Sequence, residues 1–387
     1  MILSASHRTI QHDAYDSSLR NPNYLTESHM TSLRIAPPTM ASSELKIVVS
    51  QIAPADWDEY VSSHGYLGFM LRREWPAIFQ RSMGQQPYFL TAYVNGRIGG
   101  VLPLSLLDTW LFGRFLVSLP YLNSGGVLAD SAEIAESLID HATQLADELN
   151  VRSLELRHET KHNHPRLNAE NTSKVHMRLA LPETTEQLWT DLKSKVRSQV
   201  RKPLNDKRFV VVWGRQELLD DFYQVFCRNM RDLGTPPFPK SLFAGILDAF
   251  PDNAEICCVY FDGQLASAAL LVHGPGVTQV PSASTIRDFN PTGVNMRMYW
   301  HQLCRSVERR QHTFDFGRST IDSGTYRFKK QWGAQECPAV WQSLIRKGDP
   351  GEMRPDNGKF RLAIRIWQKI PIRITQWIGP KIVRGIP

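Results

Sequence analysis

The sequence of 387 residues is 42% hydrophobic and 10% aromatic, which is enough material for two packed domains. No stretch of about 18 apolar residues occurs, which excludes an ordinary transmembrane helix. Residues 1–43 contain no apolar run, so we expect no secretory signal and a cytoplasmic protein. The net charge of +7 is confined to residues 359–387, which contain seven Lys and Arg residues and no acidic residue. Because the rest of the chain is balanced in charge, we expect no DNA partner.

The five cysteines and a group of histidines carry no predicted metal or disulfide. The cysteine count is odd, and no pair has the CxxC spacing. His158, His162 and His164 lie close together, but in a polar loop with Asn and Lys residues. We therefore predict reduced cysteines, mostly in the core, and no metal ion.

The first half is predicted to form one mixed α/β unit after a disordered segment at 1–43. In chain order we expect a strand, two helices, two hairpin strands, a helix and a strand: 45–52, 54–63, 69–83, 88–94, 97–107, 131–149 and 153–157. The hairpin prediction depends on Asn95-Gly96, because both residues of such a turn must accept a positive φ.

The second half repeats this order. We expect a strand, three helices, two hairpin strands, a third strand, a helix and a last strand: 175–181, 184–205, 216–233, 240–250, 255–261, 264–272, 278–286, 293–310 and 313–318. The Asp262-Gly263 turn aligns with Asn95-Gly96 without gaps, and the final strands end in Arg157 and Arg318. Two features that recur in order indicate an internal duplication. We divide the chain into domains at 44–174 and 175–350, flanked by a segment at 1–43 and a tail at 351–387.

Several motifs of the second half resemble those of the FemAB family. They are a basic helix start, a Leu-Gly-Thr-Pro run, an Asp-Phe-Gly-Arg-Ser run and a Phe-Lys-Lys-Gln-Trp-Gly run: 193–202, 233–236, 315–319 and 328–333. The resemblance covers roughly residues 45–387. The closing segment 377–384 resembles the branch of that family associated with exosortase (PEP-CTERM) and exopolysaccharide systems. The resemblance implies two tandem acyl-CoA N-acyltransferase (GNAT)-like domains, each with a central mixed sheet flanked by helices.

The resemblance also implies an activity. It indicates an acyltransferase that moves an acyl or aminoacyl group to an amine of a cell-envelope or exopolysaccharide precursor. The implied donor is either an aminoacyl-tRNA or an acyl-CoA, and no metal is implied. The Lys of the family's Phe-Lys motif falls on Lys329, where it is expected to stabilise negative charge on the reacting carbonyl.

Aminolysis of an ester or thioester requires alignment, a donor for the oxyanion and a route for one proton. The candidate cations are Lys329, Lys330 and Arg318. Tyr326 is a candidate donor or proton relay, and Asp315 a candidate acceptor of the ammonium proton. The alternatives are a solvated helix face for the two lysines and a structural role for Asp315, which is equivalent to Glu155. No general base is identified.

Substrate-binding candidates lie in both halves. The cations of the helix at 193–202 suit a phosphate-bearing ligand, and the loop at 121–126 has the polar and glycine content of an acceptor rim. Arg157, equivalent to Arg318, could bind a carboxylate of a ligand or of its own unit. The segment 290–296, which could present backbone amides to a pyrophosphate, and the helix that follows it complete the set, although a single glycine in this segment departs from the loop of acyl-CoA-binding families. The candidates are Arg197, Arg201, Lys202, Tyr121, Asn123, Gly125, Gly126, Arg157, Asn295 and Trp300.

The tail is basic and amphipathic, with prolines at 371 and 380 expected to kink or end its helix. Cations every four residues beside an apolar stripe favour two alternatives: a helix in the interface of an anionic inner membrane, through 359–387, or a helix packed on the domain.

Two further functions stay open, an acyl-CoA-dependent N-acyltransferase and a non-catalytic scaffold for polysaccharide assembly at the membrane surface.

Overall fold

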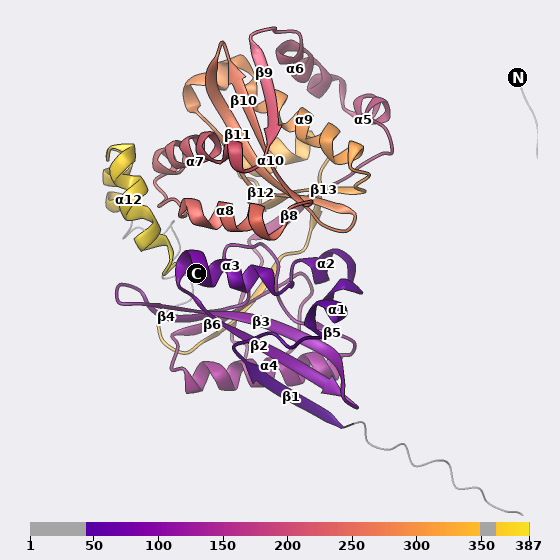
Figure 1. The fold of residues 1–387 in the computed structure, drawn as a ribbon, viewed down its shortest axis with the longest axis vertical. Helices are drawn as coiled ribbons and strands as arrows, with labels where there is room; N and C mark the ends of the chain where they lie inside the picture. Colours follow the sequence, from indigo (N-terminus) through magenta and orange to yellow (C-terminus); the bar gives the residue numbers. More distant parts are fainter. Residues whose placement is uncertain (1–43, 349–360, 387) are drawn as a thin grey trace, which may run out of the picture. The chain divides into compact units, whose positions relative to one another are not determined.

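The computed structural model describes residues 44–348 and 361–386 (Figure 1). The predicted disorder of 1–43 and the first part of the tail lie outside this range. Within it, the chain forms two mixed sheets flanked by helices, so the predicted mixed α/β class is confirmed. No helix in these residues is long and apolar enough to cross a membrane.

The first sheet has eight strands. Seven follow the order β1-β2-β3-β4-β6-β15-β7, and β5 pairs with β3. Their bounds are Leu45–Ser50 (β1), Gln86–Val94 (β2), Arg97–Thr109 (β3), Gly113–Val117 (β4), Leu128–Ala129 (β5), Ser153–His158 (β6), Ala169–Asn171 (β7) and Val340–Ile345 (β15). Helix α4 (Ala132–Glu148) covers one face of this sheet. The other face packs against α1 (Trp57–Ser62), α2 (Gly65–Phe69) and α3 (Glu74–Met83).

The second sheet has seven strands in the order β14-β8-β13-β12-β11-β10-β9. Their bounds are Lys174–Ala180 (β8), Phe209–Gly214 (β9), Ala254–Phe261 (β10), Gln264–His273 (β11), Val277–Thr285 (β12), Thr313–Thr320 (β13) and Gln335–Cys337 (β14). One face packs against α7 (Leu219–Leu233) and α8 (Lys240–Ala249). The other packs against α5 (Thr185–Asp191), α6 (Ser194–Leu204), α9 (Val294–Glu308) and α10 (Gly324–Gln331). Two helices follow, α11 (Arg361–Trp367) and α12 (Ile372–Val383).

Both predicted hairpins are confirmed, and they share a detail. Asn95 and Asp262 have φ of 51°, and the glycines after them also have positive φ. In each hairpin the register shifts at the same place, between Ala92 and Tyr93 in the first and between Val259 and Tyr260 in the second. The equivalent bulges support the duplication predicted from the sequence.

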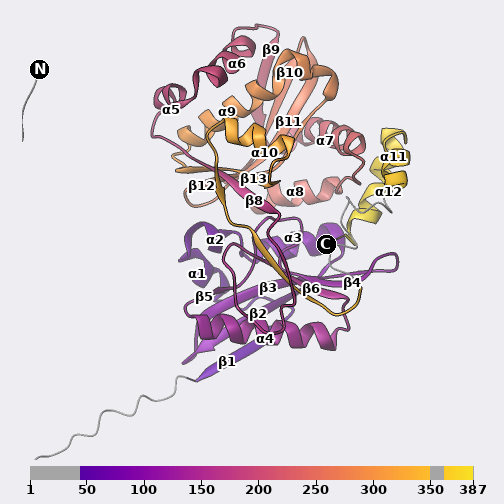
Figure 2. The ribbon, with the colours of Figure 1, turned by 180° about the vertical axis from the view of Figure 1, so that it is seen from behind.

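Apart from β5, the strands of the two sheets correspond one to one, but their next-to-last strands differ in chain order: β8 precedes the other strands of its sheet, whereas β15 follows those of its own. In both, an antiparallel meander ends in a parallel pair, β4 with β6 and β12 with β13. Beyond that pair, β8 lies antiparallel to β13, and β15 lies antiparallel to β6 (Figure 2). The sequence-based division at 175–350 therefore places β15 with the second domain, whereas its hydrogen bonds are to the first sheet.

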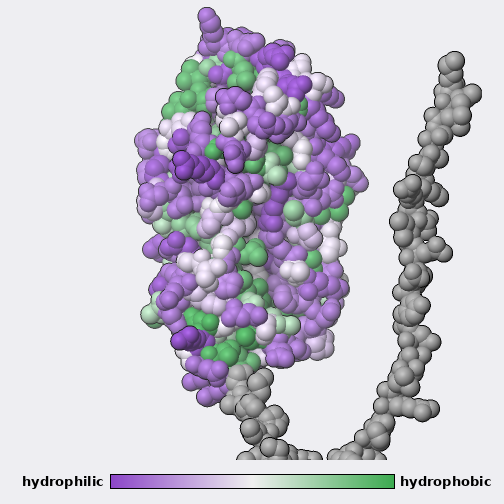
Figure 3. All heavy atoms as spheres, turned by 90° about the vertical axis from the view of Figure 1, so that its right-hand side faces the viewer, coloured by the Kyte–Doolittle hydropathy of each residue, from purple (hydrophilic) through white to green (hydrophobic). Residues whose placement is uncertain are grey.

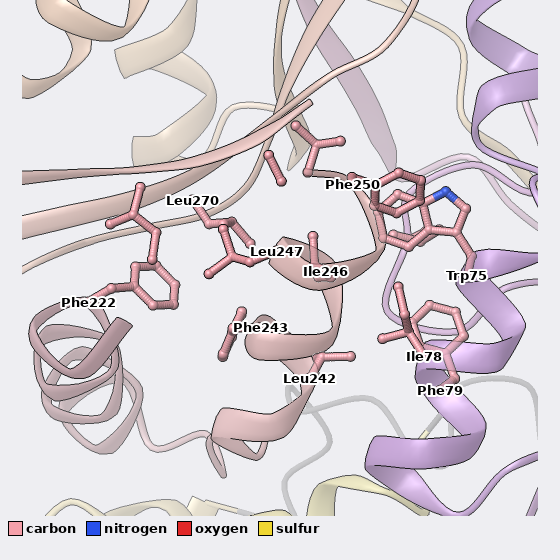
Figure 4. Close-up of a cluster of buried hydrophobic side chains, with 14 of the residues drawn as sticks. Trp75, Ile78, Phe79, Phe222, Leu242, Phe243, Ile246, Leu247, Phe250 and Leu270 are labelled. Atoms are coloured by element: carbon pink, nitrogen blue, oxygen red, sulfur yellow. The ribbon is translucent and has the colours of Figure 1, made fainter. Parts of the chain in front are cut away.

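A single apolar core joins the facing helical layers. Trp75 of α3 packs against Phe250 with ring centroids 4.7 Å apart, and Phe222 packs on Phe243 at 4.8 Å (Figure 4). A side chain at Gly245 of α8 would approach Ile78 of α3 to within 3.3 Å, which allows these helices to lie close. On the face shown in Figure 3, hydrophilic residues cover most of the surface.

Two predicted helices differ from the structure. The helix predicted at 184–205 is broken, because Leu192 and Lys193 have extended backbone between α5 and α6. Thr184 caps α5 as expected, accepting a hydrogen bond from the backbone of Gln187. In the tail the helix is interrupted at Pro371, between α11 and α12, but Pro380 does not end it, since α12 continues through Pro380 to Val383.

Candidate functional site

The site is built around a bulge in β13. The pairing of β13 with β8 shifts between Asp315 and Arg318, where Gly317 has a φ of 77°. The positive φ favours glycine here, and a Cβ at Gly317 would lie 3.2 Å from the side-chain amide nitrogen of Asn123, a tight contact. The Oδ1 of Asp315 accepts a hydrogen bond of 2.7 Å from the amide of Gly317 and holds the bulge.

Lys329 reaches the same bulge from α10. Its Nζ donates to the carbonyl oxygens of Gly317 at 2.9 Å and Arg318 at 3.2 Å. These bonds use two of the three hydrogens of an ammonium group, which leaves one for a ligand. Burial lowers the pKa of Lys329 to about 8, although the carboxylate of Asp315 favours the charged form. The amine therefore changes charge near pH 8.

A buried charge cluster, formed by Ser124, Glu159, His176, Arg178 and Asp315, adjoins the bulge. Arg178 donates to both oxygens of Glu159, at 2.8 and 2.6 Å, and to Asp315 at 3.0 Å. Burial opposes the charge on Glu159, but the hydrogen bonds from Arg178 hold the pKa of Glu159 below its ordinary value. Ser124 adds a bond of 2.6 Å to Glu159. The cluster joins residues of both halves of the chain.

Within the described part of the chain, one polar atom of this cluster and one beside it lack hydrogen-bond partners. The Nδ1 of His176 lies 3.9 Å from Asp315 and has no partner, and the buried hydroxyl of Tyr66 has none either. Burial lowers the pKa of His176, although the nearby carboxylates favour its charged form. Burial and the charge of Asp315 raise the pKa of Tyr66. Buried polar groups without partners cost free energy, so they are features that a bound ligand or water could explain.

Trp341 of β15 brings the two equivalent arginines together. The guanidinium carbons of Arg157 and Arg318 lie 4.0 and 3.0 Å from the centroid of its ring. Arg157 is paired with Glu155 at 2.8 Å and donates to the carbonyl of Leu122. Arg318 contacts the ring, and among residues 44–348 and 361–386 no carboxylate lies within ion-pair distance of it. Its pKa falls to about 9, through burial and then through repulsion by Arg157. An unpaired, largely buried guanidinium is suited to binding an anionic ligand group.

The predicted loop glycines lie at the edge of this site. The amides of Gly125 and Gly126 both donate to the carbonyl of Arg157 at 3.1 Å. A Cβ at Gly126 would lie 2.0 Å from the ring of His158, so close packing requires glycine there. These residues line a cavity of about 50 Å³. Burial lowers the pKa of His158 to about 3, and its Nε2 has no partner.

Tyr326 and Lys330 form a separate group on α10. Lys330 donates to the hydroxyl of Tyr326 at 2.8 Å and lies 3.1 Å from Glu336. The hydroxyl of Tyr326 also contacts Glu336. The amine of Lys329, in contrast, is directed to the bulge, so the structure separates the two neighbouring lysines.

The other predicted binding residues lie apart from the bulge. Arg197 donates to backbone carbonyls at the end of α5, and Arg201 lies over Trp189, whose ring contacts Trp300 at 5.1 Å. Lys202 is exposed. Asn295 accepts a bond of 3.3 Å from Thr285. The hydroxyl of Tyr121 accepts a bond of 2.5 Å from Gln85 and lies 3.4 Å from the carbonyls of Val383 and Arg384, next to the end of α12.

The comparisons with known proteins agree with this architecture. Residues 191–330 match the family described as the acetyltransferase (GNAT) domain. The solved structure of FemX is similar with a TM-score of 0.60 and 15% identity, over 77% of this chain and 97% of that one. A tandem GNAT protein from the clavulanic acid biosynthesis pathway is similar with a TM-score of 0.50 and 13% identity, over 79% and 100%. No curated protein matches the sequence.

The chain therefore has a tandem GNAT-like fold, as predicted, and residues 191–330 in its second half match the GNAT acetyltransferase domain. This domain supports an acyltransferase, and coenzyme A thioesters are the general donors of GNAT domains. Among residues 44–348 and 361–386, no group of three His, Cys, Asp or Glu side chains could hold a metal ion.

The loop before α9 does not fit a coenzyme A pyrophosphate well. Its one glycine, Gly293, would place a Cβ 3.4 Å from the ring of Pro203, so the end of α6 packs against this helix start. Arg297, in the first turn of α9, donates to the backbone carbonyls of Pro203 and Leu204. The C-terminal end of α6 therefore occupies space beside the start of α9, where a pyrophosphate would need free amides.

Five residues of the site were not predicted from the sequence: His176, Arg178, Glu159, Tyr66 and Trp341. The strand at 174–180 did contain a usable signal: His176 and Arg178 alternate with Met177, which is fully buried on the opposite face. Polar side chains at period two on a predicted strand mark a face that is either solvated or built for charge. Trp341 gave no comparable signal, because its strand was not predicted.

Proposed function

We propose that this protein is a FemAB-like acyltransferase that transfers an acyl or aminoacyl group to an amine of a cell-envelope or exopolysaccharide precursor. The observation that carries the proposal is the ammonium group of Lys329, which is fixed at the bulge of β13 with one hydrogen uncommitted. The tail motif that resembles the exosortase-associated branch supports the choice of a polysaccharide system.

In the proposed reaction the acceptor amine attacks the carbonyl carbon of the acyl donor and forms a C–N bond. Negative charge develops on the carbonyl oxygen, and the remaining hydrogen of Lys329 stabilises it. The C–O or C–S bond to the donor then breaks, and the departing oxygen or sulfur takes up the proton that the amine loses. Both oxygens of Asp315 are occupied, by Gly317 and Arg178, so in this proposal Asp315 positions the bulge.

Arg318 is assigned to the acceptor. Envelope and polysaccharide precursors carry phosphate or carboxylate groups, and a guanidinium without a protein carboxylate binds either in a bidentate manner. Trp341 holds this guanidinium in place through its ring. The nearby unpaired groups of Tyr66 and His176 would contact the same ligand or water bound with it.

We favour an aminoacyl-tRNA as donor, because the loop before α9 is poorly suited to a pyrophosphate. The second candidate is an acyl-CoA-dependent N-acyltransferase, and the match of residues 191–330 to the GNAT domain favours it. The reaction would take place on the cytoplasmic side of the inner membrane. A scaffold without activity is the third outcome of the experiment below.

The test compares two acyl donors and the replacement of each of two neighbouring lysines by alanine. Purified protein is incubated with aminoacyl-tRNA or acyl-CoA and an amine-bearing envelope precursor, and the product is identified by mass spectrometry. We expect product from the tRNA donor, and a loss of about 10²- to 10³-fold in Lys329→Ala. Lys330→Ala, the adjacent exposed lysine, is the matched control and should retain activity.

Each outcome decides one part of the proposal. Turnover with acyl-CoA alone would replace the leading donor by the second candidate. Equal activity of Lys329→Ala and Lys330→Ala would remove the assignment of the oxyanion donor. A folded wild-type protein that is inert with both donors would favour the scaffold.

A further inference from the structure

The two terminal helices each bury one side on the domain and leave an unusual side exposed. In α12, Thr375 and Val383 are buried, and Gly379 lies so close to Pro237 that a Cβ would be 2.3 Å from its ring. In α11, Trp367 is buried and Ile364 packs on Gly234. The sequence left packing and membrane binding as alternatives. The buried sides of α11 and α12 contain only part of the apolar residues of these two helices.

The outward side of these helices combines apolar residues with cations. Trp377 is 67% exposed, Leu362 68%, Ile366 55% and Ile374 44%. The exposed charged residues among them are all basic: Arg365, Lys369, Arg373, Lys381 and Arg384. Lys381 lies 4.2 Å over the ring of Trp377. Two short helices that face only water would not be expected to expose four large apolar side chains between them.

A second exposed element lies beside the end of α12. The β3–β4 hairpin ends in Trp110, which is 98% exposed, and Leu111, which is 61% exposed. The hairpin contacts the chain after α12, because a Cβ at Gly385 would lie 2.4 Å from Thr109. Figures 1 and 2 both show the hairpin and α12 at the same edge of the molecule. The one acidic residue near the tip, Asp108, is paired with Arg114 at 3.1 Å.

We propose that the hairpin tip and the outward side of α11 and α12 together form a docking surface for an anionic lipid bilayer. This terminal face consists of Trp110, Leu111, Leu362, Ile366, Ile374 and Trp377 with the five cations given above. Tryptophan and aliphatic side chains enter the interfacial layer, while the cations contact lipid phosphates. Charge complementarity selects this occupant, because no acidic residue lies between 361 and 386. The docking surface is independent of the proposed reaction.

The test is sedimentation of the full-length protein with vesicles of equal parts phosphatidylcholine and phosphatidylglycerol. We expect binding to these vesicles, little binding to pure phosphatidylcholine, and loss of binding at high salt. Replacing both Trp110 and Trp377 by Ser should weaken binding by at least about tenfold. Arg365→Gln with Lys369→Gln should weaken it by about fivefold for each cation removed. Ile52→Ser, at a residue 80% exposed between β1 and α1, is the control and should bind as wild type.

A second measurement tests whether the two elements share one face. Brominated lipids should quench the fluorescence of wild-type protein on binding, and this quenching should fall when either Trp110 or Trp377 is replaced. No vesicle binding by wild type, or binding unaffected by both tryptophan replacements, overturns the proposal. The molecular mass of the protein is also measured in solution without lipid. If it falls from that of a dimer to that of a monomer when these tryptophans are replaced, the proposal is overturned and the face is assigned to a second copy of the chain.

Discussion

Lys329 and Gly317 are joined by a hydrogen bond of 2.9 Å from the lysine ammonium to the glycine carbonyl oxygen. The bond ties α10 to the bulge of β13 and keeps the lysine where burial lowers its pKa to about 8. It also sets the orientation of the one remaining ammonium hydrogen. The chemistry assigned to this site therefore depends on the shape of a single bulge.

The rate of acyl transfer should fall as pH rises through about 8. The pKa of Lys329 lies near that value, and only the protonated lysine can donate to the oxyanion. The attacking amine must be deprotonated, which gives the rising limb at lower pH. The measurement is kcat against pH from about 6 to 10 with saturating donor. Lys329→Arg should move the falling limb upward, whereas a limb unchanged in this variant would assign it to another group.

Gly317→Ala should destabilise the fold by roughly 1–3 kcal/mol, because the positive φ is strained for alanine and the new Cβ would meet Asn123. Activity should fall as well, since the carbonyl that holds Lys329 would shift. Chemical denaturation monitored by fluorescence gives the free energy of unfolding. Gly324→Ala is the matched control, because no atom lies within 4 Å of its Cβ position and it sits at the start of α10. Similar losses in both variants would argue against a special role for the bulge.

Arg318→Met and Arg157→Met should change stability in opposite directions. Arg318 is unpaired, so replacing it should stabilise the fold by up to about 1 kcal/mol while transfer to the anionic acceptor slows at least about tenfold. Arg157→Met should destabilise by roughly 2–3 kcal/mol, because it leaves Glu155 and the carbonyl of Leu122 without their donor. Thermal unfolding and acceptor KM measure both effects. Destabilisation by Arg318→Met would show that the stack on Trp341 is mainly structural.

The stability of the fold should decrease between pH 7 and 5, in part through His158. Its folded pKa of about 3 lies below the ordinary value of 6.5, so the unfolded chain takes up the proton first as pH falls. The contribution of His158 to the free energy of unfolding is complete above pH 6.5 and should be smaller by roughly 2 kcal/mol at pH 5. His158→Gln should remove that part of the slope, measured by urea unfolding at each pH. The exposed His312→Gln is the control, and equal slopes for the two variants would contradict the assignment.

The hairpins and the order of elements could be predicted from the sequence because their signals are local. A turn such as Asn95-Gly96 fixes its own geometry, and the lysine at 329 could be located through a short motif. The contacts of that lysine could not be predicted, since they depend on a bulge that forms only when β13 pairs with β8. His176 and Arg178 were similarly invisible as a cluster, because their partners lie on other strands. β15 was missed because six residues with weak alternation do not indicate which sheet they will join.

The placement of β15 in the first sheet has a consequence during synthesis. When residues 44–174 have left the ribosome, β6 can pair only with β4 on one side, because the strand that pairs with its other side, β15, lies about 170 residues further along the chain. Until it emerges, the edge of β6 offers unpaired backbone groups to any other extended segment. At typical elongation rates of roughly 5–20 residues per second, this open interval lasts on the order of ten seconds or more. The nascent chain thus has a defined period in which a chaperone would be most useful to it.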